Sequence, residues 1–117
     1  MKRCYLAGPY RDSRGEWFVQ QNIEHAGEVA RKLWRDGFSV MCPHKNTSFY
    51  GGTDIPDQIW LDGDLEWIKV SDILVLMPDW ERSSGTRAEK EFAEKLGIPV
   101  YVWPNVPRPE DVQERTK

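Results

Sequence analysis

The stretch that decides the fold begins Ile73-Leu74-Val75-Leu76-Met77 and ends Ser83-Ser84-Gly85-Thr86-Arg87-Ala88-Glu89-Lys90-Glu91-Phe92-Ala93. Its five apolar residues predict a strand buried on both faces, as in a parallel sheet. The small polar residues that follow predict a turn into a helix. The free N–H groups and the positive dipole end of such a turn suit a phosphate or another anion. Glu89 lies about one turn into this helix, so we expect its carboxylate to face the same crevice. The alternative is a serine N-cap followed by a solvated glutamate.

The rest of the chain alternates strands and helices in the same way. Apolar runs predict strands at 4–7, 38–42, 72–77 and 98–103, and helical periodicity predicts helices at 14–36, 55–70 and 84–96. This order predicts an α/β fold, a flavodoxin- or Rossmann-like doubly wound parallel sheet of about four strands in the order 2-1-3-4. We expect one domain at 1–103 and a polar tail or short helix at 104–117.

The helical periodicity also predicts which side chains are buried. In the first long helix the inward face consists of Phe18, Asn22, Ala26, Val29, Ala30 and Leu33, and in the second of Leu61, Leu65 and Ile68. The long loop between them, residues 44–57, is expected to act as a mobile lid. Its hinge is Gly51-Gly52, and Phe49 and Tyr50 are its stacking groups. A flexible connector without a role is the alternative.

Composition excludes several classes of function. The 117 residues carry a net charge of −3 and no long basic run, which argues against a nucleic-acid polymer as partner. The longest apolar run, about five residues, is far too short to span a membrane. The two cysteines lack metal-ligand spacing and indicate free thiols in a reducing cytoplasm. We therefore expect a cytoplasmic protein without metal or cofactor.

The predicted topology collects one set of residues around a crevice. Ligands of such sheets bind where the strand order reverses, at the carboxyl ends of the first and third strands. This rule brings together residues 8–11, 43–47 and 79–85. The candidate substrate- and phosphate-binding residues are Gly8, Tyr10, Arg11, His44, Asn46, Ser83, Ser84 and Gly85. For Arg11 the alternative to a phosphate contact is an ordinary solvated charge.

Two further residues are candidates for chemistry. Asp64 stands next to the inward stripe of the second long helix, so it can reach the crevice, although a solvated acidic face is the ordinary interpretation of Asp62-Gly63-Asp64-Leu65-Glu66. Tyr5 lies in the first strand just before a turn. A tyrosine there is more often a packing residue than a catalytic one.

Taken together and in order, these motifs resemble the nucleoside 2-deoxyribosyltransferase superfamily, and most closely its 2′-deoxynucleoside 5′-monophosphate N-glycosidases. The resemblance rests on Tyr5-Leu6-Ala7-Gly8, on the segment from Asp64 to Asp72, and on Ser83 through Ala93. It covers about residues 3–103. It implies that Glu89 is the nucleophilic carboxylate and that Asp64 is an acid/base or substrate-orienting carboxylate. It also implies that Tyr5 positions the nucleophile by hydrogen bonding.

Departures from the family pattern refine the expected substrate. The transferases carry an aspartate six residues before their nucleophile, whereas this chain has Ser83, as the monophosphate hydrolases do. A hydroxyl accepts a phosphate that an aspartate would repel. The segment Gly85-Thr86-x-x-Glu89 is also similar to phosphoribohydrolases of the cytokinin-activating type, so ribose and deoxyribose both stay open. Small relatives of unassigned function share Ala7–Tyr10 and Pro43–Thr47.

The sequence thus predicts cleavage of an N-glycosidic bond, by hydrolysis or deoxyribosyl transfer, in a small nucleotide or nucleoside. The alternatives are a non-catalytic nucleotide-binding module of the same fold and an interaction protein, and a need for the Glu89 carboxylate separates the first from the enzyme. We also expect a homodimer or higher homo-oligomer. The family completes its sites with a neighbouring subunit, and Trp60, Trp67 and Trp80 flank the crevice.

Overall fold

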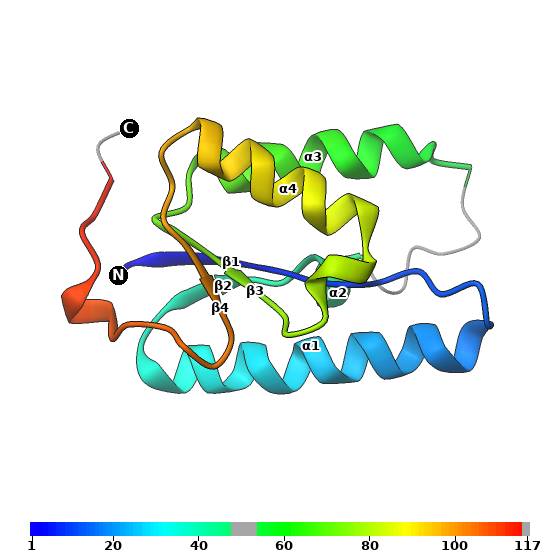
Figure 1. Cartoon of the computed structure of the whole chain (residues 1–117), viewed down its shortest axis with the longest axis horizontal. Helices are drawn as coiled ribbons and strands as arrows, with labels where there is room; N and C mark the ends of the chain where they lie inside the picture. Colours follow the sequence, from blue (N-terminus) through cyan, green and yellow to red (C-terminus); the bar gives the residue numbers. More distant parts are fainter. Residues whose placement is uncertain (48–53, 116–117) are drawn as a thin grey trace.

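The structure is a computed structural model that describes residues 1–47 and 54–115. Its centre is a four-stranded sheet in the order β2-β1-β3-β4, and all three neighbouring pairs run parallel (Figure 1). The strands are β1 Arg3–Ala7, β2 Ser39–Met41, β3 Ile73–Leu76 and β4 Val100–Val102. The predicted fold class and strand order are confirmed.

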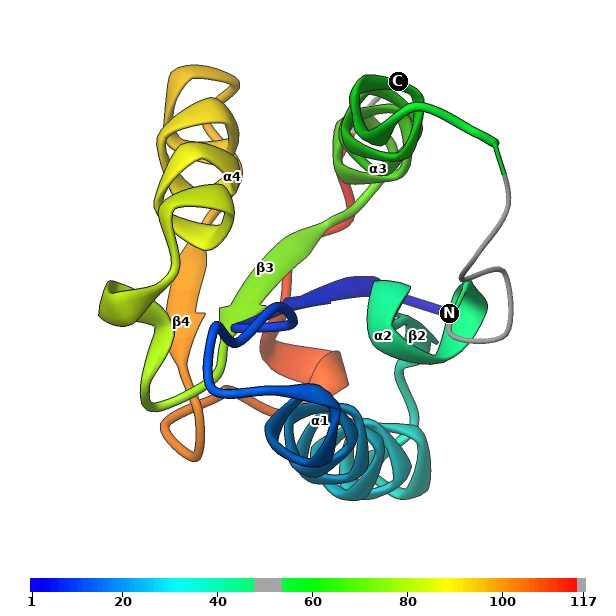
Figure 2. The same cartoon turned by 90° about the vertical axis from the view of Figure 1, so that its right-hand side faces the viewer.

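Helices cover both faces of this sheet. The long helix α1 packs on one face, and α3 and α4 lie side by side on the other (Figures 1 and 2). The bounds are α1 Glu16–Asp36, α2 Pro43–Asn46, α3 Asp57–Lys69 and α4 Ser84–Lys95, with short 3₁₀ turns η1 Trp80–Arg82 and η2 Pro109–Asp111. The helix α2 replaces the start of the predicted loop. It begins at Pro43, whose fixed φ favours the first helical position.

The core has two halves because neighbouring residues of β1 point to opposite faces. Cys4 and Leu6 pack toward α1, whereas Tyr5 and Ala7 pack toward α3 and α4. Every residue of β3 is buried, as a central parallel strand requires.

Two predicted core residues are wrong. Phe18 is only half-buried, because it lies near the start of α1 and its ring is covered by the Arg14 guanidinium, 3.8 Å from the ring centroid. Leu61 is 47% exposed. The first half of α3 extends past the ends of the strands, so its side chains have no sheet beneath them (Figure 1).

Residues after β4 pack back onto the domain. Val112 is buried in the core half that faces α1, and the Lys2 Nζ donates hydrogen bonds to the carbonyls of Pro109 and Val112. The Asp72 carboxylate accepts hydrogen bonds from the backbone N–H groups of Arg3, at 2.7 Å, and Arg115, at 2.8 Å. The segment predicted as a tail or short helix therefore contains η2 and contributes an apolar side chain to the core.

Three sequence-based expectations concern features other than the sheet. Cys4 and Cys42 are free thiols, and both are buried. Within the part of the chain that the structure describes, no helix is both long enough and apolar enough to cross a membrane. The predicted lid residues Phe49 and Tyr50 and the predicted hinge Gly51-Gly52 lie outside the described residues.

Candidate active site

A crevice of about 580 Å³ opens at the carboxyl ends of β1 and β3, where the predicted switch point lies. Figure 2 looks onto this end of the sheet, with α3 and α4 on one side and α2 on the other. Three segments far apart in sequence line it. They are the end of β1 with the turn after it, the region of α2 and α3, and the turn into α4. The candidate site residues among them are Gly8, Tyr10, Arg11, His44, Asp64, Ser83, Ser84, Gly85 and Glu89.

Glu89 lines the crevice, and a second predicted catalytic residue, Tyr5, is buried behind it and forms a hydrogen bond with it. The hydroxyl of Tyr5 donates to Oε2 of Glu89 at 2.5 Å. Tyr5 comes from the middle of β1 and is fully buried, whereas Glu89 comes from the second turn of α4. The sheet therefore fixes the donor, and the donor fixes one oxygen of the carboxylate. The other oxygen is left for a ligand.

The two carboxylates have raised pKa values. Burial raises the pKa of Glu89 to about 7, the Tyr5 hydrogen bond opposes the shift, and the charge of Asp64 adds to it. Burial raises the pKa of Asp64 to about 6. The pKa of Tyr5 is raised first by burial and then by the charges of Glu89 and Asp64, so its phenol stays protonated. Two carboxyl groups that change charge near neutral pH therefore stand at the crevice, and the Tyr5 phenol beside them is a hydrogen-bond donor that keeps its proton.

The turn into α4 both caps the helix and lines the crevice, so the two interpretations of its serines, N-cap and anion site, are compatible. The Ser83 hydroxyl oxygen accepts hydrogen bonds from Thr86 N at 3.1 Å and Thr86 Oγ1 at 3.0 Å, so Ser83 is the N-cap of α4. The hydroxyl proton of Ser83 is not used in these two bonds. Ser84 and Gly85 line the crevice beside it, in the first turn of a helix whose N–H groups lack intrahelical acceptors. The turn can therefore bind an anion and cap the helix at once.

Gly8 lines the crevice, and packing requires a glycine at this position. A Cβ on Gly8 would lie 2.8 Å from the Cβ of Met77, which is closer than side chains tolerate. Gly8 therefore allows the close approach of Met77, the residue that follows β3, and its predicted role, close approach of a ligand, stays a prediction.

His44 is a buried residue at the wall of the crevice. Burial is the main cause that lowers its pKa. Its Nε2 lies 2.7 Å from the carbonyl oxygen of Pro9, so Nε2 carries the proton and Nδ1 is an acceptor. Within residues 1–47 and 54–115, Nδ1 has no hydrogen-bond partner. The ring of Tyr10 packs at 5.7 Å between centroids.

Cations reach the crevice from two directions, and only one was predicted. Arg11 lines it and forms an ion pair with Asp57, from the first turn of α3. Arg82, which we missed, also lines it. The Arg82 Nη2 bonds to Asp79 at 2.9 Å and to the Asn22 side chain at 3.0 Å. The position of Arg82 directly before Ser83 indicated a place near the crevice. A cation beside acidic residues, however, also fits an ordinary surface ion pair.

Asn46 does not join the site. It lies on the other side of α2 and lines a different pocket with Met41 and Cys42. Trp60, Leu61 and Asp57 line the crevice although none of them was a candidate site residue. In the described residues, no group of three or more His, Cys, Asp or Glu side chains is arranged to hold a metal ion.

Comparisons with known proteins agree with this architecture. A family described as "Domain of unknown function (DUF4406)" matches residues 2–102. No curated protein matches the chain in sequence. Among solved structures, a 2-deoxyribosyltransferase from the psychrotolerant bacterium Bacillus psychrosaccharolyticus is 25% identical with a TM-score of 0.65, over 86% of this chain and 70% of that one.

Two further structures show the same fold. A 2-desoxiribosyltransferase from Leishmania mexicana is 16% identical, with a TM-score of 0.64 over 87% of this chain and 63% of that one. A conserved protein from Enterococcus faecalis V583 is 24% identical, with a TM-score of 0.65 over 87% and 62%. This chain thus spans less than two thirds of the length of these two. Its fold is that of the 2-deoxyribosyltransferases, as the sequence resemblance implied.

Proposed function

The chain belongs to the DUF4406 family, and we propose that it is an enzyme that breaks the N-glycosidic bond of a small nucleotide or nucleoside. The observation that carries this proposal is the group formed by Tyr5, Glu89 and Asp64. The first two share a 2.5 Å hydrogen bond, and the charge of Asp64 raises the pKa of both. The likeness to the 2-deoxyribosyltransferase of Bacillus psychrosaccharolyticus supports the same reaction class.

In the first step, the free oxygen of the Glu89 carboxylate attacks the anomeric carbon of the sugar. The bond from that carbon to the base nitrogen breaks, and its electron pair leaves with the base. The carboxyl group of Asp64 gives its proton to the departing base, which its raised pKa of about 6 allows. Tyr5 holds the nucleophile in place, because its hydroxyl fixes one carboxylate oxygen and leaves the other to react.

In the second step, the ester between Glu89 and the sugar is broken. The Asp64 carboxylate takes a proton from water, the water oxygen attacks the anomeric carbon, and Glu89 leaves as a carboxylate. A second base in place of water completes a deoxyribosyl transfer. Both outcomes use the same residues, so the acceptor is decided by access to the crevice.

We propose a 5′-monophosphate rather than a free nucleoside as the substrate, as for the N-glycosidase branch. The Ser83 hydroxyl, the first N–H groups of α4 and the guanidinium of Arg82 stand on one side of the crevice and suit three phosphate oxygens. Arg11 lines the same crevice and adds a second guanidinium.

The experiment is a panel of ribo- and deoxyribonucleosides and their 5′-monophosphates, each incubated with the protein and analysed for free base by chromatography. Glu89→Gln should reduce base release by several orders of magnitude, as loss of a covalent nucleophile does. The matched control is Glu91→Gln, an exposed residue of the same helix, which should leave the rate unchanged. Equal rates for wild type and Glu89→Gln would overturn the reaction proposed here. Equal affinity for a nucleoside and its monophosphate would overturn the phosphate preference.

We also propose a homodimer or higher homo-oligomer that completes the crevice. The helix α3 exposes Ile59 by 58%, Leu61 by 47% and Trp67 by 49%. Apolar side chains of this size next to a crevice suit the core of an interface. Light scattering should give at least a dimer mass at micromolar concentration, and a monomer mass throughout would refute the proposal.

A further inference from the structure

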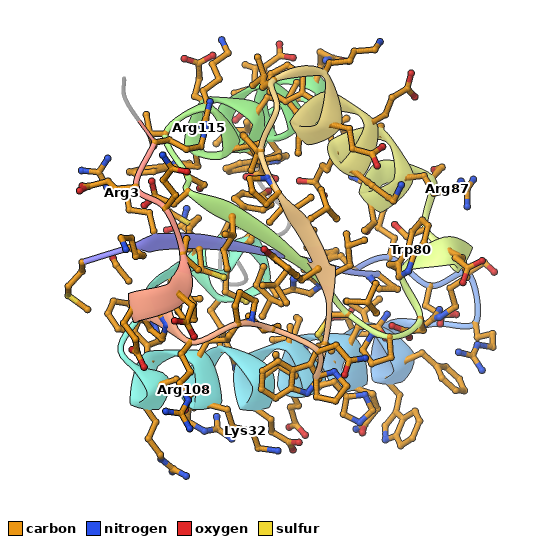
Figure 3. The ribbon with its side chains drawn as sticks, turned by 60° about the vertical axis from the view of Figure 1, so that its left-hand side comes forward. Arg3, Lys32, Trp80, Arg87, Arg108 and Arg115 are labelled. Atoms are coloured by element: carbon orange, nitrogen blue, oxygen red, sulfur yellow. The ribbon has the colours of Figure 1, made fainter. Side chains whose placement is uncertain are left out.

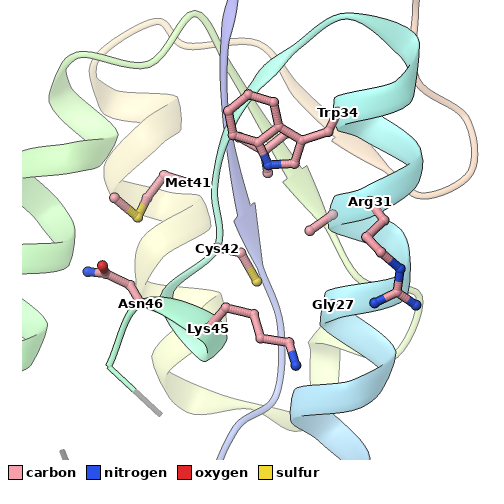
Figure 4. Close-up of a pocket in the computed structure, with 9 residues that line it drawn as sticks. Gly27, Arg31, Trp34, Met41, Cys42, Lys45 and Asn46 are labelled. Carbon is pink, nitrogen blue, oxygen red and sulfur yellow. The ribbon is translucent and has the colours of Figure 1, made fainter. Parts of the chain in front are cut away.

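A second pocket, of about 380 Å³, lies between α1 and the segment formed by β2 and α2 (Figure 4). It is separate from the crevice. The short helix α2 stands between the two, with His44 on the crevice and Lys45 and Asn46 on the pocket. From the side of α1 it is lined by Gly27, Arg31 and Trp34.

Two cationic groups converge in this pocket. Figure 4 shows Lys45 extending from α2 toward Gly27 and Arg31 on α1. Measured from the point where a Cβ on Gly27 would stand, the Nζ of Lys45 lies at 3.2 Å and the Nη1 of Arg31 at 3.7 Å. Because Gly27 has no side chain, an ammonium and a guanidinium share a small space beside the middle of α1.

The described part of the chain supplies no ion-pair partner to either cation. Among residues 1–47 and 54–115, neither Arg31 nor Lys45 has a carboxylate within ion-pair distance, whereas Arg11, Arg14 and Arg82 are all paired. The ammonium and the guanidinium repel each other because both lie close to the same point beside Gly27. A bound anion would attract both cations and accept charge-assisted hydrogen bonds from them.

The far end of the pocket carries an aromatic surface. Trp34 lines the pocket and is 50% exposed, on the same side of α1 as Gly27 and Arg31 (Figure 4). Trp34 stands seven positions after Gly27, which is about 10 Å along the helix axis. A mononucleotide likewise carries its charged phosphate at one end and its planar base at the other. The cavity volume also falls in the range typical of small-ligand sites.

We infer that this pocket is a second binding site for a phosphorylated ligand with a planar ring, such as a nucleotide. The phosphate lies between Arg31 and Lys45, and the ring stacks on the indole of Trp34. The site stands on its own observations and does not depend on the reaction proposed for the crevice.

The test is a titration followed by two-dimensional NMR of the nitrogen-15-labelled full chain. Adenosine 5′-monophosphate is the probe, with adenosine and inorganic pyrophosphate as partial ligands. The monophosphate should shift the indole N–H of Trp34, assigned with Trp34→Phe, and the amide of Gly27. Pyrophosphate should shift the Gly27 amide, and adenosine should do neither at the same concentration. Shifts confined to the Trp60 indole would report the crevice alone and would overturn the inference.

Variants assign the binding to the two cations. Lys45→Ala and Arg31→Ala should each weaken monophosphate binding about tenfold or more, because each removes hydrogen bonds to a charged group. Lys32→Ala is the matched control, since Lys32 lies on the outer side of α1 (Figure 3) and should leave the affinity unchanged.

Gly27→Ala separates binding from folding. Its methyl group would stand 2.5 Å from Cε of Lys45, so the end of the flexible lysine side chain must move from its present position. Alanine is also more favourable than glycine in a helix interior, so the variant should be at least as stable as the wild type. We expect an unchanged or higher melting temperature and a binding loss of about tenfold, as for Lys45→Ala. Wild-type affinity in Gly27→Ala, or adenosine binding as tightly as its monophosphate, would overturn the inference.

Discussion

Replacing Tyr5 by phenylalanine should change how activity depends on pH rather than abolish it at every pH. The substitution removes one oxygen atom and leaves the ring in its buried place between β1 and the helices α3 and α4. The lost hydroxyl is the donor that favours the ionised form of Glu89, so the pKa of Glu89 must rise further. Glu89 attacks only as a carboxylate.

The magnitude follows from the strength of that bond. A hydrogen bond to a charged group contributes about 1.5–3 kcal/mol, which corresponds to about one to two pKa units. The pKa of Glu89 would move from about 7 to a value between about 8 and 9. At pH 6, where Asp64 is still half protonated, the fraction of ionised Glu89 and hence the rate should fall about 10- to 100-fold.

Near pH 9 the two proteins should differ by about twofold or less, because at least about half of Glu89 is then ionised in the variant and nearly all of it in the wild type. The assay is kcat/KM for base release between pH 5 and pH 9.5, with carbon-13 NMR of the Glu89 carboxyl as a direct measure of its titration. Tyr101→Phe, in β4 on the other core half, is the control and should follow wild type. A Tyr5→Phe rate reduced by the same factor at every pH would refute the reasoning, since the hydroxyl would then act on something other than the ionisation of Glu89.

Three further outcomes follow from the structure. In urea titrations, Glu89→Gln should raise the free energy of unfolding by about 1–3 kcal/mol at pH 8 and hardly at pH 4. The folded-state pKa of Glu89, about 7, exceeds the ordinary 4.5, so the wild type loses stability as the pH rises through the folded-state value. Equal effects at both pH values would contradict this. Asp57→Asn should tighten monophosphate binding several-fold in calorimetry by releasing Arg11 from its ion pair, and an unchanged affinity would remove Arg11 from the phosphate site. Val112→Ala should cost about 1–2 kcal/mol of stability in the same urea titrations, and no loss would mean that the segment after β4 does not support the core.

The fold and the main residues of the site could be predicted from the sequence because both follow from short-range patterns. Right-handed crossovers leave few orders for four parallel strands, and the switch point then places residues that follow β1 and β3 together. Tyr5 lies within β1, two residues before its end, and Glu89 lies in the helix that follows β3, so both are close to that point. Their 2.5 Å hydrogen bond is the contact that the family resemblance implied.

The errors arise where a residue's environment depends on distant parts of the chain. Asn46 sits in a four-residue helix, too short for any periodicity to show which way its side chains point. Leu61 has the spacing of a core residue, but α3 continues beyond the sheet that would bury it. Arg82 is held by Asn22, sixty residues away, and no local pattern encodes that contact.

Tyr5 belongs to the core and to the site at once, which makes the site sensitive to strand register. A slip of one residue in β1 would turn Tyr5 toward α1 and present Cys4 or Leu6 to Glu89. Such a molecule would keep its helices and its parallel strands, so circular dichroism would count it as folded. It would lack the donor that holds the nucleophile. Under the proposed reaction, the specific activity of a preparation therefore measures how many molecules have β1 in its native register.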